Sequence, residues 1–292
     1  MKKIICLLLS VLLVVASFAG CAKTEEITFS RTVDAGDIAV VSFNCAAPWG
    51  NILDGTSSSV RVKRFAAYMN SVRPDSIGTQ EMNFDWMEKL STLMEDYDSY
   101  GVVRGGDDGE KKSEMNSIFW LRDKYDCIDK NTFWLSETPE TESKYDGAGC
   151  NRICSYVMLR DKETGQTYLH MNTHLDNASD EARVFGAKVI KDKINELKES
   201  YEYDFKIVLT GDFNDIESGN PCKEINSILT SCSTANPENE KSTYTDWGEL
   251  ENDGEPIDFI FTDGEPAGYM ILDNTADGFV SDHYGVYATI KL

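Results

Sequence analysis

The chain has 292 residues, of which 41% are hydrophobic and 11% are aromatic. This apolar content is enough for a sizeable core, and it excludes a largely disordered chain. Lysine and arginine number 28 against 50 aspartates and glutamates, which gives a formal net charge of −22. A surface this acidic repels phosphate backbones, so it excludes a protein that coats nucleic acid through broad electrostatic attraction.

The first residues have the pattern of a targeting segment. Lys2 and Lys3 precede an apolar run over 4–19, which is short for a membrane-spanning helix, and Gly20 and Cys21 follow it. The tetrapeptide 18–21 (FAGC) resembles a bacterial lipobox, in which the cysteine carries the lipid. We therefore predict a signal peptide over 1–20, lipidation of Cys21, a polar tether over 21–35 and a single domain over 36–292. This predicts an exported, lipid-anchored monomer on the extracytoplasmic face of the cell membrane; the alternative is an uncleaved N-terminal anchor.

Six cysteines remain after Cys6 and Cys21. They include no Cys-x-x-Cys pair, which argues against a structural zinc site. Cys222 and Cys232 flank a segment with a helical pattern, and a helix of that length would hold them about 15 Å apart, too far for a disulfide. We expect six buried free thiols; the alternative is disulfides, because an exported chain folds in an oxidising compartment.

Short apolar runs and two amphipathic patterns define the expected elements. One helix carries an apolar stripe from Val60 to Met69, and a second runs from Ala182 to Leu197 with Asn177 or Ser179 as its N-cap. Strands outnumber helices and several follow one another directly, which favours an α+β sandwich over a doubly wound parallel sheet. The expected strands, in chain order, cover 38–43, 76–79, 117–121, 154–159, 167–173, 206–210, 257–262 and 284–290.

Polar residues occur at the ends of these runs. In a mixed sheet the exits of some strands share an edge with the entrances of their antiparallel neighbours, so these residues are expected to meet in one cleft. Each of them taken alone fits a turn former or a structural histidine, but six such placements together favour a site. Carboxylates and amides with few histidines suit Mg²⁺ or Mn²⁺ rather than zinc. The placements are Asn44, Gln80-Glu81, His174-Leu175-Asp176, Gly211-Asp212-Phe213-Asn214, Asp258 and Asp282-His283.

These motifs resemble a known family in their identity and order. Asn44, Gln80-Glu81 and the segments 172–176 (NTHLD), 211–214 (GDFN), 257–260 (IDFI) and 281–283 (SDH) resemble the endonuclease/exonuclease/phosphatase superfamily over nearly the whole chain from about residue 37. The segment 133–140 (FWLSETPE) further resembles a bacterial secreted branch of it. The resemblance implies a four-layer α/β/β/α sandwich of two mixed sheets with helices on the outer faces. It also implies divalent-metal-dependent hydrolysis of phosphoesters.

Phosphoester hydrolysis must neutralise the phosphoryl charge and align a water opposite the leaving oxygen. Glu81 with Asn44 is expected to hold Mg²⁺, with Asp282 as a second metal ligand. Asp212 is expected to orient or deprotonate the attacking water, and Asn214, His174 and His283 to contact the phosphate. By resemblance Asp258 positions His283, and Glu114 positions His174. Arg152 is a candidate phosphate contact, with a surface salt bridge as the alternative. His170 is expected to pack or to support the site from behind.

The substrate is less well defined by the sequence. Ten acidic residues and one basic residue lie between Ser233 and Gly268, in a stretch that borders the substrate groove in the family. If this is more than a solvated loop, it disfavours duplex nucleic acid. Tyr145 and Cys150 depart from the family pattern near the expected cleft wall, which affects substrate selection. We therefore expect a hydrolase of small or lipid-linked phosphoesters; the alternatives are a secreted nuclease and a catalytically silent ligand-binding lipoprotein.

Overall fold

The apolar runs of the sequence form the inner strands of two six-stranded sheets. The computed structural model describes residues 36–46, 57–106, 113–238, 241–250, 254–272 and 278–292. These described residues all belong to one compact unit. The predicted signal peptide, Cys21 and the tether lie outside the described residues.

The first sheet has the strand order β11-β12-β1-β2-β4-β3. Its parallel pair is β1 with β2, and the other neighbours run antiparallel. The strands are β1 (Asp37–Asn44), β2 (Ser76–Met82), β3 (Tyr97–Tyr100), β4 (Met115–Leu121), β11 (Glu265–Leu272) and β12 (Gly285–Lys291).

The second sheet has the order β5-β6-β7-β8-β10-β9 and repeats this plan. Its parallel pair is β7 with β8, and antiparallel strands lie on both sides of that pair. The strands are β5 (Tyr125–Trp134), β6 (Ile153–Asp161), β7 (Thr167–His174), β8 (Lys206–Asp212), β9 (Thr230–Ser231) and β10 (Asp258–Thr262).

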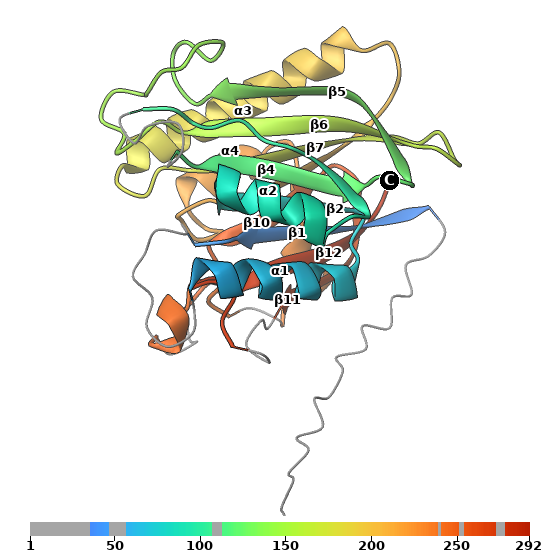
Figure 1. Cartoon of the computed structure of the whole chain (residues 1–292). Helices are drawn as coiled ribbons and strands as arrows, with labels where there is room; N and C mark the ends of the chain where they lie inside the picture. Colours follow the sequence, from blue (N-terminus) through green and yellow to red (C-terminus); the bar gives the residue numbers. More distant parts are fainter. Residues whose placement is uncertain (1–35, 47–56, 107–112, 239–240, 251–253, 273–277) are drawn as a thin grey trace, which may run out of the picture. The chain divides into compact units, whose positions relative to one another are not determined.

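Helices cover the outer faces of both sheets, which confirms the predicted four-layer sandwich (Figure 1). A parallel strand pair needs a crossover, and α1 and α3 are the crossovers of the two sheets. Ser179, one of the two predicted caps, accepts a hydrogen bond from the Ala182 amide at the start of α3. No helix in the described ranges is both long and apolar enough to cross a membrane. The helices are α1 (Ser58–Val72), α2 (Phe84–Leu93), α3 (Asp180–Ser200) and α4 (Asn220–Asn226), with 3₁₀ turns at Cys232–Ala235 and Asp246–Gly248.

Buried polar side chains form hydrogen bonds across the layer between the two sheets. The buried His170 ring bonds to Ser76 Oγ of the first sheet at 2.8 Å and to Thr210 Oγ1 of its own sheet at 3.0 Å, so His170 packs in this layer as predicted. Gln80 Nε2 reaches Asn172 Oδ1 across the layer at 2.7 Å. A Cβ atom added at Gly78 would lie 2.0 Å from Thr210 Oγ1, so the two sheets approach closely here because residue 78 is a glycine.

The cysteine prediction needs correction. All six cysteines of the described residues have free thiols, but Cys127 and Cys150 are only half-buried, so six buried thiols was wrong. The helix expected between Cys222 and Cys232 ends at Asn226, and β9 follows it. The actual connection is therefore not the continuous helix on which the 15 Å separation was based.

Candidate active site

The two parallel strand pairs each deliver two polar residues to the same edge of the sandwich. In the first sheet Asn44 lies beside Gln80, with Glu81 next along the chain. In the second sheet His174 lies beside Asp212. The carboxyl ends of parallel strands meet at one edge, and a hydrogen bond from Asn44 Nδ2 to Asp212 Oδ2 at 2.9 Å joins the two edges.

Antiparallel neighbours complete this edge, as the sequence predicted. Asp258 begins β10 and pairs in register with Asp212. His283 precedes β12, which runs antiparallel to β1. The spatial convergence of Glu81, Asp212 and His283 in one cleft is therefore observed.

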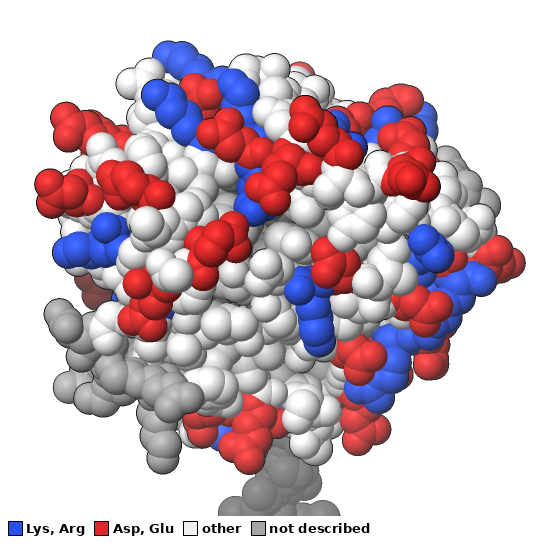
Figure 2. All heavy atoms as spheres, turned by 90° about the horizontal axis from the view of Figure 1, so that it is seen from above, with Lys and Arg blue, Asp and Glu red and all other residues white. Residues whose placement is uncertain are grey.

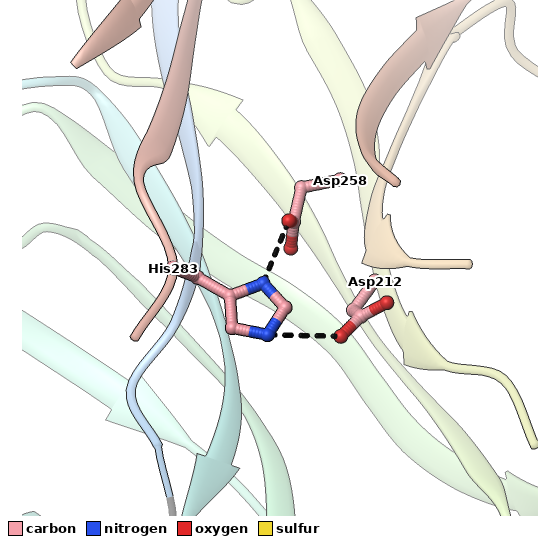
Figure 3. Close-up of side chains that lie close together, drawn as sticks. All are labelled: Asp212, Asp258 and His283. Atoms are coloured by element: carbon pink, nitrogen blue, oxygen red, sulfur yellow. Dashed lines mark hydrogen bonds and ion pairs between the residues drawn. The ribbon is translucent and has the colours of Figure 1, made fainter. Parts of the chain in front are cut away.

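His283 lies between two buried carboxylates (Figure 3). Its Nδ1 is 2.9 Å from Asp258 Oδ2, and its Nε2 is 3.8 Å from Asp212 Oδ2. Burial alone would lower the pKa of His283, but the negative charges of Asp258, Asp212 and Asp282 raise it to about 10. The predicted support of His283 by Asp258 is observed, and it favours an imidazolium with Nε2–H directed at the cleft.

Asp212 is the central carboxylate of the cleft. Its Oδ1 accepts the Asn214 backbone N–H at 2.8 Å, and its Oδ2 accepts from Asn44. Burial and the neighbouring Asp258 raise the pKa of Asp212 to about 7. A carboxyl group with such a pKa can accept a proton near neutral pH, as a general base requires.

His174 has a different environment from the one predicted. Its Nε2 lies 3.6 Å from Asp212 Oδ2, but its buried Nδ1 has no hydrogen-bond partner among the residues that the structure describes. Burial, together with the charges of Arg152 and Arg104, lowers the pKa of His174 well below its usual value. The predicted support by Glu114 is wrong in this structure, because the Glu114 carboxylate forms an ion pair with Arg104 at 2.6 Å.

Arg152 is neither a surface salt bridge nor an unpaired phosphate contact. It is buried, its Nε lies 3.5 Å from Asp176 Oδ2, and its Nη2 donates to Asn177 Oδ1 at 3.0 Å. It nevertheless lines the cleft together with His174. The surface alternative was wrong, and a contact to phosphate stays a prediction.

The predicted metal ligands lie at the first-sheet side of the cleft. Glu81 has a left-handed backbone (φ 57°) where the pairing of β2 with β4 shifts register, an irregularity often found beside active sites. Asn44 Nδ2 donates to Glu81 Oε1 at 3.2 Å, and Asn44 Oδ1 accepts from the Ala46 amide. Asn44 thus acts as a hydrogen-bond donor to the carboxylates here, and direct metal ligation by it stays a prediction.

The chemistry of the donors fits a hard divalent cation. Burial and the charge of nearby Glu81 raise the pKa of Asp282, although His283 opposes the shift. Asp212, Asp258 and His283 also bring one nitrogen or oxygen atom each within 4.8 Å of one another, but an imidazolium at His283 has no lone pair for a metal, so only the carboxylates of this group could contact a cation. Among the described residues, the buried Asp258 Oδ1 has no hydrogen-bond partner. A cation beside this excess of carboxylates would relieve their mutual repulsion.

The cleft has a volume of about 410 Å³ and includes residues that the sequence analysis missed. Asn214 Nδ2 donates to Leu175 O at 3.0 Å, which leaves its second N–H for a ligand. Tyr244 reaches the cleft from the acidic stretch, and its ring packs 5.1 Å from that of His283. Tyr145 instead stacks on Phe185 at 4.3 Å. Cys150 lines the cleft, as expected for a residue of its wall. The lining residues that the sequence analysis missed are Arg104, Asn177, Tyr244 and Ile257.

Several solved structures have a similar fold, and their sequences are more distantly similar to this one. A mannosyl-6-phosphatase from Bacteroides thetaiotaomicron is 28% identical, with a TM-score of 0.79 over 87% of this chain and 100% of that one. An endonuclease/exonuclease/phosphatase family protein from the same species is 27% identical (TM-score 0.78; 87% and 94% covered), and another from Bacteroides vulgatus is 28% identical (TM-score 0.78; 88% and 99% covered). No protein-family model and no curated protein matches the sequence.

Proposed function

The chain belongs to the endonuclease/exonuclease/phosphatase superfamily, and we propose that it is a divalent-metal-dependent phosphoester hydrolase that acts on small phosphoesters. One observation carries the proposal. Asp212, a carboxylate whose pKa is raised to about 7, is faced by both His283 and His174 in a cleft at the sandwich edge. A general base beside two hydrogen-bond donors can deprotonate a water for in-line attack while the donors stabilise the charge on the phosphoryl oxygens.

Four side chains of the cleft have separate roles in the proposed reaction. Asp212 orients the attacking water and accepts its proton at a carboxylate oxygen. His283 Nε2–H donates to a phosphoryl oxygen while Asp258 holds Nδ1 and stabilises the imidazolium. Neutral His174 donates a further hydrogen bond, and the second N–H of Asn214 reaches the same phosphoryl group. Each of these donors is held in place by hydrogen bonds or by packing before the substrate arrives.

Glu81 and Asp282 would hold the cation, Mg²⁺ or Mn²⁺, with Asn44 hydrogen-bonded to Glu81. When bound, such an ion supplies positive charge to the leaving oxygen and lowers the barrier to its departure. The two carboxylates supply only oxygen donors, which is why we propose a hard cation rather than zinc.

The size and charge of the cleft favour a small substrate over duplex DNA. A volume of about 410 Å³ suits a single phosphorylated small molecule. Seen from the side of β5 and α3 (Figure 2), acidic and basic side chains are interspersed over the surface, which gives that face no broad basic patch for a phosphate backbone. The similarity to a protein named as a mannosyl-6-phosphatase supports a phosphomonoester as the substrate class.

A screen of metals against substrates tests the proposal. Purified chain is assayed with Mg²⁺, Mn²⁺, Ca²⁺ or EDTA on p-nitrophenyl phosphate, bis-p-nitrophenyl phosphate, hexose 6-phosphates and supercoiled plasmid. We expect hydrolysis of small phosphoesters with Mg²⁺ or Mn²⁺, which EDTA and Asp212→Asn abolish. Asp126→Asn, which changes an exposed carboxylate at the start of β5 that does not line the cleft, is the matched control. Rapid plasmid nicking at physiological salt would favour the nuclease alternative, and inactivity on every substrate would favour the silent lipoprotein.

We further propose that the chain is exported and tethered through a lipid on Cys21. The support is the sequence pattern of residues 1–21 alone. Expression with a labelled fatty acid in a bacterium that processes lipoproteins tests it, with Cys21→Ala as the variant. We expect label in the membrane fraction for the unmodified chain and none for the variant. Equal labelling of the two chains would contradict the proposal.

A further inference from the structure

One end of the cleft carries an ion pair that the proposed chemistry does not use. Arg104 Nη1 lies 2.6 Å from Glu114 Oε2, and the two side chains are only 12% and 13% exposed. Both residues line the cleft. This pair is therefore shielded from bulk water but accessible to a ligand in the cleft.

The backbone around this pair is held firmly. The Arg104 N–H donates to Glu114 O at 2.8 Å. Its carbonyl accepts Trp134 Nε1 at 2.8 Å and Asn151 Nδ2 at 3.1 Å. The side chains of Trp134, at the end of β5, and Asn151, just before β6, thus fix the backbone of a residue next to the first sheet, which gives a preorganised position rather than a loose surface arginine.

Strand order places the pair beside Glu81. The first sheet runs β12-β1-β2-β4-β3, so its cleft edge passes from His283 through Asn44 and Glu81 to the residues flanking β4 and β3. Glu114 immediately precedes β4, and Arg104 follows β3. In the proposed reaction, the phosphoryl group lies among Asp212 and the two histidines, and the leaving oxygen faces Glu81. The rest of the leaving group therefore extends toward Arg104 and Glu114.

The charge at this end is balanced, in contrast to the acidic centre. Glu114 neutralises Arg104, and Asp176 is paired with Arg152. A neutral pair offers N–H donors and carboxylate acceptors next to one another. Sugar hydroxyls are donors and acceptors at once and match such a pair, whereas a second phosphate would meet the Glu114 carboxylate.

We propose that Arg104 and Glu114 form a subsite for the hydroxyl groups of a sugar leaving group, which makes the substrate a sugar phosphate. This inference rests on the proposed function, because it takes the phosphoryl position from that chemistry. Arg104 and Glu114 are specificity residues here; the bond-breaking groups are those described above.

The test compares a substrate with hydroxyl groups and one without them. For Arg104→Gln/Glu114→Gln, the ratio of kcat/KM for a hexose 6-phosphate to that for p-nitrophenyl phosphate is expected to fall about 10- to 100-fold, because charge-assisted hydrogen bonds to the sugar are lost. Arg104→Lys keeps the charge but loses the planar fork, so it is expected to lower the same ratio by a smaller factor. The control is Arg122→Gln/Asp98→Asn, a matched ion pair on the exposed surface, which is expected to leave the ratio unchanged.

Binding without turnover separates this inference from the proposed function. Calorimetry in EDTA, on an Asp212→Asn background, measures the affinity for hexose 6-phosphate with and without the paired substitution. We expect affinity to weaken about 10-fold or more. This readout holds even if the chain hydrolyses none of the substrates, an outcome that would refute the proposed function alone.

Two results would overturn the inference. In the first, the paired variant melts normally, its kcat/KM falls equally for both substrates or for neither, and its affinity for hexose 6-phosphate is unchanged. The other is an Arg104-dependent preference for a hexose bisphosphate over the monophosphate, which would make the subsite an anion site. If the paired variant does not fold, the Arg104→Lys ratio decides between the same outcomes.

Discussion

The two histidines that face Asp212 lie in opposite electrostatic environments. His283 is bonded to the buried Asp258, and surrounding carboxylates raise its pKa to about 10. His174 has an unpartnered Nδ1, and burial with two nearby arginines lowers its pKa well below the usual value. The same side chain is therefore cationic on one side of Asp212 and neutral on the other. This difference indicates that the two histidines make unequal contributions to catalysis.

Removing the cationic histidine is expected to have the largest effect. His283→Gln keeps an uncharged N–H donor of similar length. It loses the positive charge of the imidazolium and the fixed orientation of its Nε2–H toward the phosphoryl group. We expect kcat to fall by about 10³-fold or more. Steady-state kinetics on the best small phosphoester measures this loss. A variant with more than a tenth of the original kcat would place the chemistry elsewhere.

Removing Asp258, the carboxylate partner of His283, is expected to have the next largest effect. Asp258→Asn keeps the shape but no longer stabilises the imidazolium or holds its tautomer, so kcat is expected to fall by about 10²- to 10³-fold. Glu114→Gln is the informative comparison because Glu114 pairs with Arg104, and among the described residues no group hydrogen-bonds to His174 Nδ1. If Glu114→Gln lowers kcat on p-nitrophenyl phosphate as much as Asp258→Asn does, then the conclusion that the two histidines contribute unequally is wrong.

Changing the neutral histidine is expected to have a smaller effect. His174→Asn removes one uncharged donor to a charged group, an interaction that accounts for about 10- to 100-fold in rate. The same kinetic assay measures it, with melting curves to verify folding. A loss equal to that of His283→Gln would mean that both histidines act as charged groups during turnover.

The third histidine, His170, is a reference for burial without catalysis. Burial lowers its pKa to about 3, so between pH 6.5 and 3 the unfolded chain binds a proton that the folded chain does not. Its contribution to stability therefore falls as pH decreases, by at most about 1.4 kcal/mol per unit. The melting temperature of His170→Asn is expected to be lower than that of the unmodified chain at pH 7, with a smaller difference at pH 5. A difference that grows toward pH 5 would contradict this assignment.

The sequence predicted those parts of the fold that have a local signal. All eight predicted strands are present, because each has a run of buried apolar residues. The prediction missed β5, whose middle is polar and exposed because it is an edge strand, and β11, another edge strand with alternating exposure. It also missed the short strands β3 and β9, which contain few residues to form a pattern.

The placement of the site was predicted better than its pairings. Strand ends identify where Asp212, Asp258 and His283 meet, since the edges of the sheets follow from strand direction. The positions of the strand ends do not identify which carboxylate forms an ion pair with a given arginine. Arg104 takes Glu114, and Arg152 lies beside Asp176, because of side-chain positions that only the packed sheets define.

The glycine at position 78 has a consequence for how activity responds to mutation. Glu81 belongs to one sheet and Asp212 to the other, so neither half of the sandwich holds a complete set of reactive groups. Any side chain at position 78 would press against Thr210 and Asn172 of the opposite sheet and act as a wedge between the two sheets. Such a wedge would separate the two halves of the catalytic apparatus while leaving every functional residue unaltered, so it would disable the enzyme from a distance.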